Sequence, residues 1–159
     1  MSNEERFDEL MDEASSMPES REKVEVLEQA IQIADEMQDV RAGMMSRSEL
    51  IQAASFSGVD DKATVAFAWC SSHLDHAEFE GREYVRHDVL WKAKWVIEKV
   101  YGFPNVPWEK CEALVEDIEN RYKQYGHSLR PIHSERMSAE VMRGNFEQAL
   151  QHRRQQRRH

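Results

Sequence analysis

Apolar side chains recur every three or four residues along almost the whole chain of 159 residues. This spacing is typical of amphipathic α-helices and is strongest over residues 24–37, 40–54, 63–77, 85–100 and 108–125. No segment alternates apolar and polar residues for long enough to predict a β-strand, and the chain has only 6 Gly and 4 Pro. The sequence therefore predicts an all-α protein of about seven or eight helices.

Several helix ends are also visible. Residues 18–20 (Pro-Glu-Ser) predict a helix start, and Asp60 and Asp61 suit the positive N-terminal end of another helix. Ser57 and Gly58 predict a stop. Residues 102–107 form the clearest loop in the sequence.

Glycines mark a repeat in the predicted helix pairs. Gly58, Gly102 and Gly144 are separated by 44 and 42 residues, a period that favours a helical solenoid. Each glycine is expected to end one helix in a backbone conformation that other residues resist, so that the next helix runs antiparallel. We expect one helical-repeat domain over 1–159. Its segments are an acidic N-terminal helix (1–19) and four repeat segments (20–57, 58–101, 102–143 and 144–159).

These turns resemble those of tetratricopeptide repeats, in which a small residue in the second helix precedes an aromatic residue by four positions. Ala63 and Phe67 match that pair, and the sequence GNFEQAL at 144–150 is similar to the family's turn and second-helix start. Trp91 lies where the family often has tryptophan, although Lys94 and Trp95 replace its leucine-glycine pair. The resemblance covers roughly residues 20–155 with degenerate motifs. A different helical repeat or a compact helix bundle is the alternative.

The resemblance implies a stacked array of helix pairs that binds a protein or peptide in a groove lined by the first helices. Carried onto this chain, the groove residues come from three helices. They are Met45, Ser48, Gln52 and Phe56, then Val89, Lys92, Val96 and Lys99, and finally Ser134, Ser138 and Val141.

Two of these residues are cations that suit an acidic peptide or a C-terminal carboxylate. Lys92 and Lys99 lie seven residues apart on one predicted helix. The chaperone-binding members of the family place an asparagine beside their lysines, and Val96 occupies that position here. The plainer explanation is two solvated helix lysines.

Catalytic and cofactor motifs have little support. His73 and His76 lie three residues apart, so both can face one metal ion, but they also suit a helix C-terminus. Cys70 and Cys111 fall on apolar stripes, where a buried thiol is inert packing. The sequence contains no phosphate-loop, dinucleotide or nucleophile-elbow motif. We expect no catalysis, no cofactor and no resident metal, with a metal-binding helical enzyme as the least favoured alternative.

Charge is unevenly distributed along the chain, whose net charge is −9. Residues 1–40 hold 13 Asp/Glu and 3 Lys/Arg, whereas residues 121–159 hold 9 Lys/Arg and 3 Asp/Glu. Such a pattern serves solubility, and it also suits a homodimer that pairs the acidic N-terminal region with the basic C-terminal region. Arg153, Arg154, Arg157 and Arg158 form the one basic run. No aromatic residues alternate with them, so we expect no nucleic-acid binding.

The sequence has no apolar run of membrane-spanning length, and its acidic N-terminus predicts no secretory signal. Two cysteines suit a reducing, cytoplasmic setting. We therefore expect a cytoplasmic scaffold or adaptor that binds a protein or peptide. The alternative is the ligand- or peptide-sensing domain of a bacterial regulator, of which this chain would be a fragment.

Overall fold

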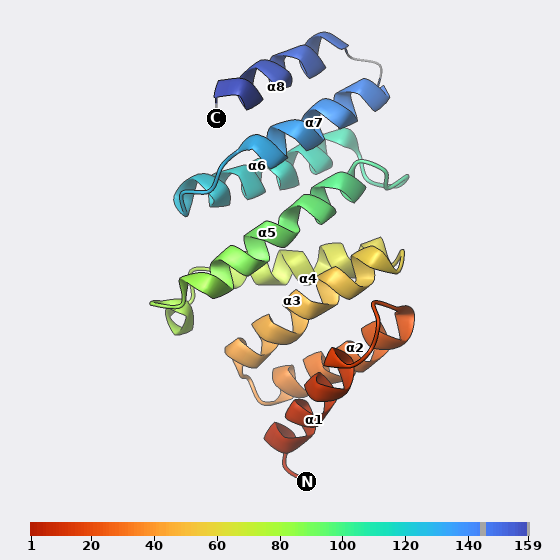
Figure 1. Ribbon diagram of the computed structural model, residues 1–159, viewed down its shortest axis with the longest axis vertical. Helices are drawn as coiled ribbons and strands as arrows, with labels where there is room; N and C mark the ends of the chain where they lie inside the picture. Colours follow the sequence, from red (N-terminus) through yellow and green to blue (C-terminus); the bar gives the residue numbers. More distant parts are fainter. Residues whose placement is uncertain (144–145, 159) are drawn as a thin grey trace. The chain divides into compact units, whose positions relative to one another are not determined.

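The chain is all-helical in a computed structural model that describes residues 1–143 and 146–158. These residues form eight α-helices, one 3-10 helix and no strand (Figure 1). The helices are α1 (Asn3–Ser15), α2 (Arg21–Glu36), α3 (Val40–Phe56), α4 (Asp60–His73), η1 (Ala77–Phe79), α5 (Glu83–Val100), α6 (Trp108–Gln124), α7 (Arg130–Arg143) and α8 (Phe146–Arg158). The predicted all-α class and helix number are confirmed.

Helix starts follow the expected capping chemistry. The Ser20 hydroxyl accepts a hydrogen bond from the Lys23 backbone N–H at 3.2 Å, so residues 18–20 do begin a helix. Asp39 caps α3 in the same way through Ala42. Helix α4 begins at Asp60 as predicted, although its N-cap residue Val59 makes no side-chain capping bond.

The glycine turns are less uniform than the repeat predicted. Gly58 has a φ of +78°, which is the left-handed conformation that favours glycine. Gly102 lies outside that region, so the expectation of a left-handed turn is wrong there. The turn predicted at Gly144 and Asn145 falls outside the described residues.

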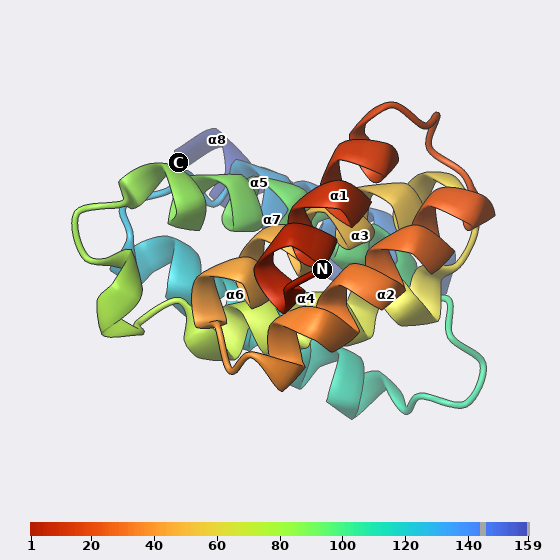
Figure 2. The same cartoon turned by 90° about the horizontal axis from the view of Figure 1, so that it is seen from below.

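The chain divides into two compact units, residues 1–92 and 93–159. In the first unit each helix packs against its neighbour in sequence: α1 against α2, α2 against α3, and α3 against α4. The core between the first three helices combines Phe7 and Leu10 of α1 with Ala30, Ala34 and Ala42. Small alanines let α1 approach closely, and Figure 2 shows α1 nearest the viewer beside α2.

The second unit contains the end of α5 together with α6, α7 and α8, and α7 packs against α8. Arg136 of α7 joins α6 through its guanidinium, which lies 2.9 Å from Glu119 and 3.9 Å from Glu112. The Tyr101 hydroxyl donates to Glu112 at 2.7 Å. The expectation that residues 1–159 form a single domain stays a prediction.

Across residues 1–143 and 146–158, no helix combines the length and the apolar character that crossing a bilayer requires.

Candidate functional site

A groove of about 1030 Å³ opens in the first unit. Four helices contribute to its lining: the C-terminal half of α1, the start of α2, the middle of α3 and the first three turns of α5. Three of them, α1, α3 and α5, are alternate helices in the chain order. The groove therefore depends on residues that lie far apart in sequence.

The groove walls are mainly apolar and only partly covered. Met44 is buried beneath the surface, whereas Met45 beside it is 47% exposed. Tyr84 and Trp91 of α5 are 65% and 49% exposed, and Met11 of α1 is half-buried. Large apolar side chains that gather in one groove and remain exposed are typical of a binding surface.

A buried ammonium group fastens α3 to α5 beside this groove. Lys92 is only 3% exposed, and its Nζ donates to the backbone oxygen of Ser48 at 3.0 Å and to the Ser48 hydroxyl at 2.9 Å. The same Nζ lies 3.2 Å from Asp88 Oδ2. The Ser48 hydroxyl in turn donates to that carboxylate. These contacts supply three acceptors for the three ammonium protons, which is the condition for burying a lysine.

This arrangement also bears on catalysis. A serine next to a lysine acts as a nucleophile only when the lysine is neutral and can accept its proton. Here Lys92 donates to Ser48 and the Ser48 hydroxyl donates to Asp88, so the serine does not donate to the lysine as a serine–lysine nucleophile pair requires. The three side chains hold two groove helices together.

A second polar cluster lies where α2 begins. Lys23 is buried and lines the groove, with its Nζ 3.2 Å from Glu19 Oε1. The Gln52 side chain of α3 donates to the same oxygen at 3.4 Å. This cluster fixes the start of α2 against α3.

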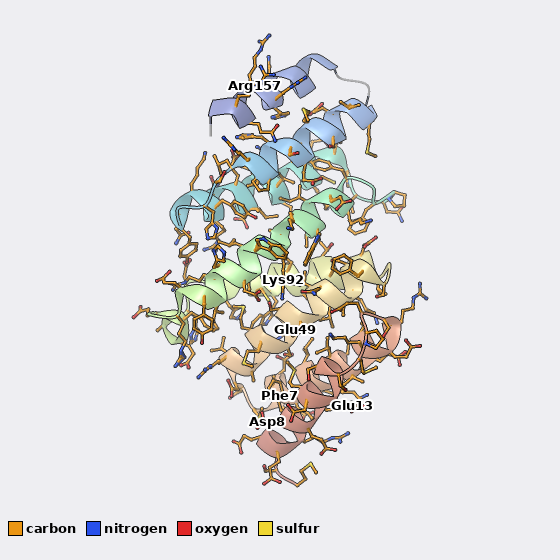
Figure 3. The ribbon with its side chains drawn as sticks, in the orientation of Figure 1. Phe7, Asp8, Glu13, Glu49, Lys92 and Arg157 are labelled. Carbon is orange, nitrogen blue, oxygen red and sulfur yellow. The ribbon has the colours of Figure 1, made fainter. Side chains whose placement is uncertain are left out.

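The rim of the groove is acidic. Glu49 and Glu83 line it and are exposed, and the Asp88 side chain is half exposed. Figure 3 shows Glu49 on α3 and places Asp8 and Glu13 on α1, the helix that forms another wall. Both of these α1 carboxylates are exposed, but neither lines the groove itself. Basic side chains of a partner would meet complementary charge there.

The structure brings together only some of the residues predicted from the repeat resemblance. Met45, Ser48 and Val89 line the groove, although Val89 is fully buried and contributes to its base. Gln52 belongs to the polar cluster with Glu19, and Phe56 is 58% exposed at the end of α3, away from the groove lining. Lys92 is neither a solvated lysine nor an exposed groove cation, because it is buried and paired.

The remaining predicted residues belong to the second unit, residues 93–159. Val96 is buried and Lys99 is exposed, both near the end of α5. Ser134 is half-buried, while the exposed Ser138 donates within α7 to the Ser134 backbone oxygen at 3.2 Å. Val141 is exposed. These residues do not line the groove of the first unit.

The sequence-based prediction missed the wall that α1 supplies and the aromatic Tyr84. Residues 1–19 form a separate acidic segment in the repeat pattern, and that pattern predicts no groove position there. The available signal was Met11, which extends the apolar stripe of α1 beyond the core residues Phe7 and Leu10.

His73 and His76, whose spacing would let both face one metal ion, make other contacts. The His73 ring stacks on Trp69 with centroids 3.8 Å apart, and its Nδ1 lies 2.8 Å from the Trp69 backbone oxygen. The His76 Nδ1 accepts from the Glu78 backbone N–H at 3.0 Å. Within the part of the chain that the structure describes, no three His, Cys, Asp or Glu side chains gather as a metal site.

The buried thiol of Cys70 stays protonated. Its pKa is raised from 9.0 to about 12, chiefly by burial; Arg47 and Lys92 lower the pKa by smaller amounts, and Asp88 raises it. Burial likewise raises the pKa of the Tyr122 hydroxyl in the second unit from 10.0 to about 12. A neutral, buried thiol is consistent with a packing role for Cys70.

These raised pKa values predict loss of stability at alkaline pH. Below pH 9 the Cys70 thiol is protonated in both the folded and the unfolded chain, so it has no effect. Between pH 9 and about 12 the unfolded chain loses this proton first, which favours unfolding by up to about 1.4 kcal/mol for each pH unit. We expect the urea midpoint to fall as pH rises above 9, and to fall less steeply in Cys70→Ala. An equal slope in that variant would assign the decline to other groups.

No protein-family model matches the chain, and comparisons with curated proteins and with solved structures give no significant match.

Proposed function

We propose that the protein is a non-catalytic scaffold or adaptor that binds an apolar, basic segment of another protein in the groove of the first unit. The observation that carries this proposal is the combination of half-exposed Met45, Tyr84 and Trp91 with an acidic rim. Aromatic anchors and adaptable methionines are the residues on which peptide binding commonly depends.

Charge decides which peptides suit the groove. The only buried cations at its edge, among the described residues, are Lys23 and Lys92, and each is already paired with a carboxylate. The exposed charges of the rim are those of Glu49, Glu83 and Asp88. An acidic peptide would meet repulsion there, so the proposal replaces the acidic ligand expected from the lysine pair with a basic one.

We further propose that the helices form an array similar to tetratricopeptide repeats, in a cytoplasmic protein. Support comes from the packing of sequence neighbours, the glycine turn at Gly58, and the lining of the groove by the alternate helices α1, α3 and α5. The free, buried Cys70 and Cys111 suit a reducing compartment.

A second candidate is the ligand-sensing domain of a regulator. The groove volume of about 1030 Å³ is close to the upper range of small-molecule sites, and its lining is mainly apolar with a few polar groups. A small-molecule screen by thermal shift distinguishes this candidate from peptide binding, because a specific ligand would raise Tm at saturating concentration.

A synthetic helix tests the peptide-binding proposal. The probe is an amphipathic peptide of leucine and lysine at helical spacing, compared with a version carrying glutamate in place of lysine. We expect the lysine peptide to bind at least about tenfold more tightly, because the rim is acidic. Trp91→Ala should weaken its binding by about tenfold or more through loss of an aromatic anchor.

The matched control is Val65→Ala on α4, where Val65 is 72% exposed and does not line this groove. Its affinity for the lysine peptide should equal that of the unmodified protein in a fluorescence anisotropy titration. Equal affinities for both peptides, or an unchanged affinity in Trp91→Ala, would contradict the proposal.

A further inference from the structure

The two compact units carry opposite net charge. Residues 1–92 contain 21 Asp/Glu and 9 Lys/Arg, a net charge of −12, while residues 93–159 contain 9 Asp/Glu and 12 Lys/Arg, a net charge of +3. Opposite charge on two surfaces of one chain favours association of one copy with the next.

The positive charge of the second unit is concentrated on its last helix. Arg153, Arg154 and Arg157 of α8 are all exposed, and Figure 3 shows Arg157 on this helix. None of the three has a carboxylate within ion-pair distance among the residues that the structure describes. Their charge is therefore available to a partner.

The groove has the matching features. Tyr84 and Trp91 present half-exposed rings, on which a planar guanidinium stacks well. Glu49 and Glu83 supply exposed carboxylates at the same rim, and an arginine can form a bidentate ion pair with a carboxylate.

We propose that the groove of one copy binds the basic face of helix α8 of a second copy. The inference rests on the proposed function, because it names the partner of the same groove. The contact joins different surfaces of the two copies, so it closes into a symmetric dimer when it is reciprocal and extends to larger assemblies when it is not.

Salt dependence of the mass is the first test. Light scattering after size-exclusion chromatography should give more than the monomer mass of 18.7 kDa at about 0.05 M salt. At about 1 M salt, where the Debye length falls to about 3 Å, the monomer should return. A monomer at every salt and protein concentration would overturn the inference. It would not affect the peptide-binding proposal, which the peptide titration tests separately.

Charge reversal identifies the surfaces. The first variant is Arg153→Glu/Arg154→Glu/Arg157→Glu, and the second is Glu49→Lys/Glu83→Lys. Each alone should weaken self-association by about tenfold or more. An equimolar mixture should associate again, because the second variant keeps its arginines and the first keeps its acidic groove. Failure of the mixture to associate would overturn the inference.

The matched control for the groove variant is Glu109→Lys/Glu116→Lys, which reverses two exposed acids of α6 and changes the net charge equally. It should self-associate like the unmodified protein. Saturation with the lysine peptide described above should dissociate the assembly by competing for the groove. Association that persists under the peptide, while the peptide itself binds, would place the second copy elsewhere and leave the proposed function standing.

Discussion

Replacing Ala63 by arginine should destabilise the first unit by about 3 kcal/mol or more. Ala63 lies in the first turn of α4, is only 2% exposed, and belongs to the helix that packs against α3. An arginine there has no room for its side chain between the two helices. Its charge also opposes the positive N-terminal end of α4. The measurement is the free energy of unfolding in urea.

Position 65 provides the matched control for this substitution. Val65→Arg adds the same side chain to the same helix at an exposed position, so its stability should change by less than about 0.5 kcal/mol. Equal urea midpoints for Ala63→Arg and the unmodified protein would show that α3 and α4 do not pack as a tight pair.

Replacing Lys92 by methionine should cost about 2 kcal/mol of stability and weaken binding of the lysine peptide. Methionine has similar length but no donors, so the hydroxyl and the backbone oxygen of Ser48 both lose a charged partner. Asp88 loses its ion pair as well, and keeps the hydrogen bond from the Ser48 hydroxyl and its contact with solvent. Urea unfolding and peptide titration measure the two effects.

The control for this variant is Lys99→Met, seven residues further along α5 at an exposed position. It should leave stability and peptide affinity nearly unchanged. Equal destabilisation by Lys92→Met and Lys99→Met would contradict the structural role of the buried lysine.

Helices were predictable from this sequence because their signals are local. The start at Ser20 depends on a hydroxyl three residues from its partner, and the break at Gly58 depends on one residue's backbone conformation. The apolar spacing from 108 to 125 likewise predicted α6, which runs from Trp108 to Gln124. Such features need no knowledge of the rest of the fold.

The site was harder to predict because its side chains are positioned by distant partners. Lys92 and Lys99 look equivalent at helical spacing, yet one is buried against Ser48 and the other is exposed. Only the packing of α5 on α3, which joins residues 44 positions apart, separates them. The groove wall that α1 forms was not predictable from the sequence for the same reason.

The link between Lys92 and Ser48 also has a consequence for synthesis. The chain is synthesised from its N-terminus, so helices α1 to α4 emerge from the ribosome before α5 has been synthesised. Until residue 92 has emerged, Ser48 lacks its partners Asp88 and Lys92 on α5, and the apolar lining of the groove is open to other nascent chains. The first unit can therefore finish folding only after all of its 92 residues have emerged, although each helix contact within α1 to α4 joins sequence neighbours.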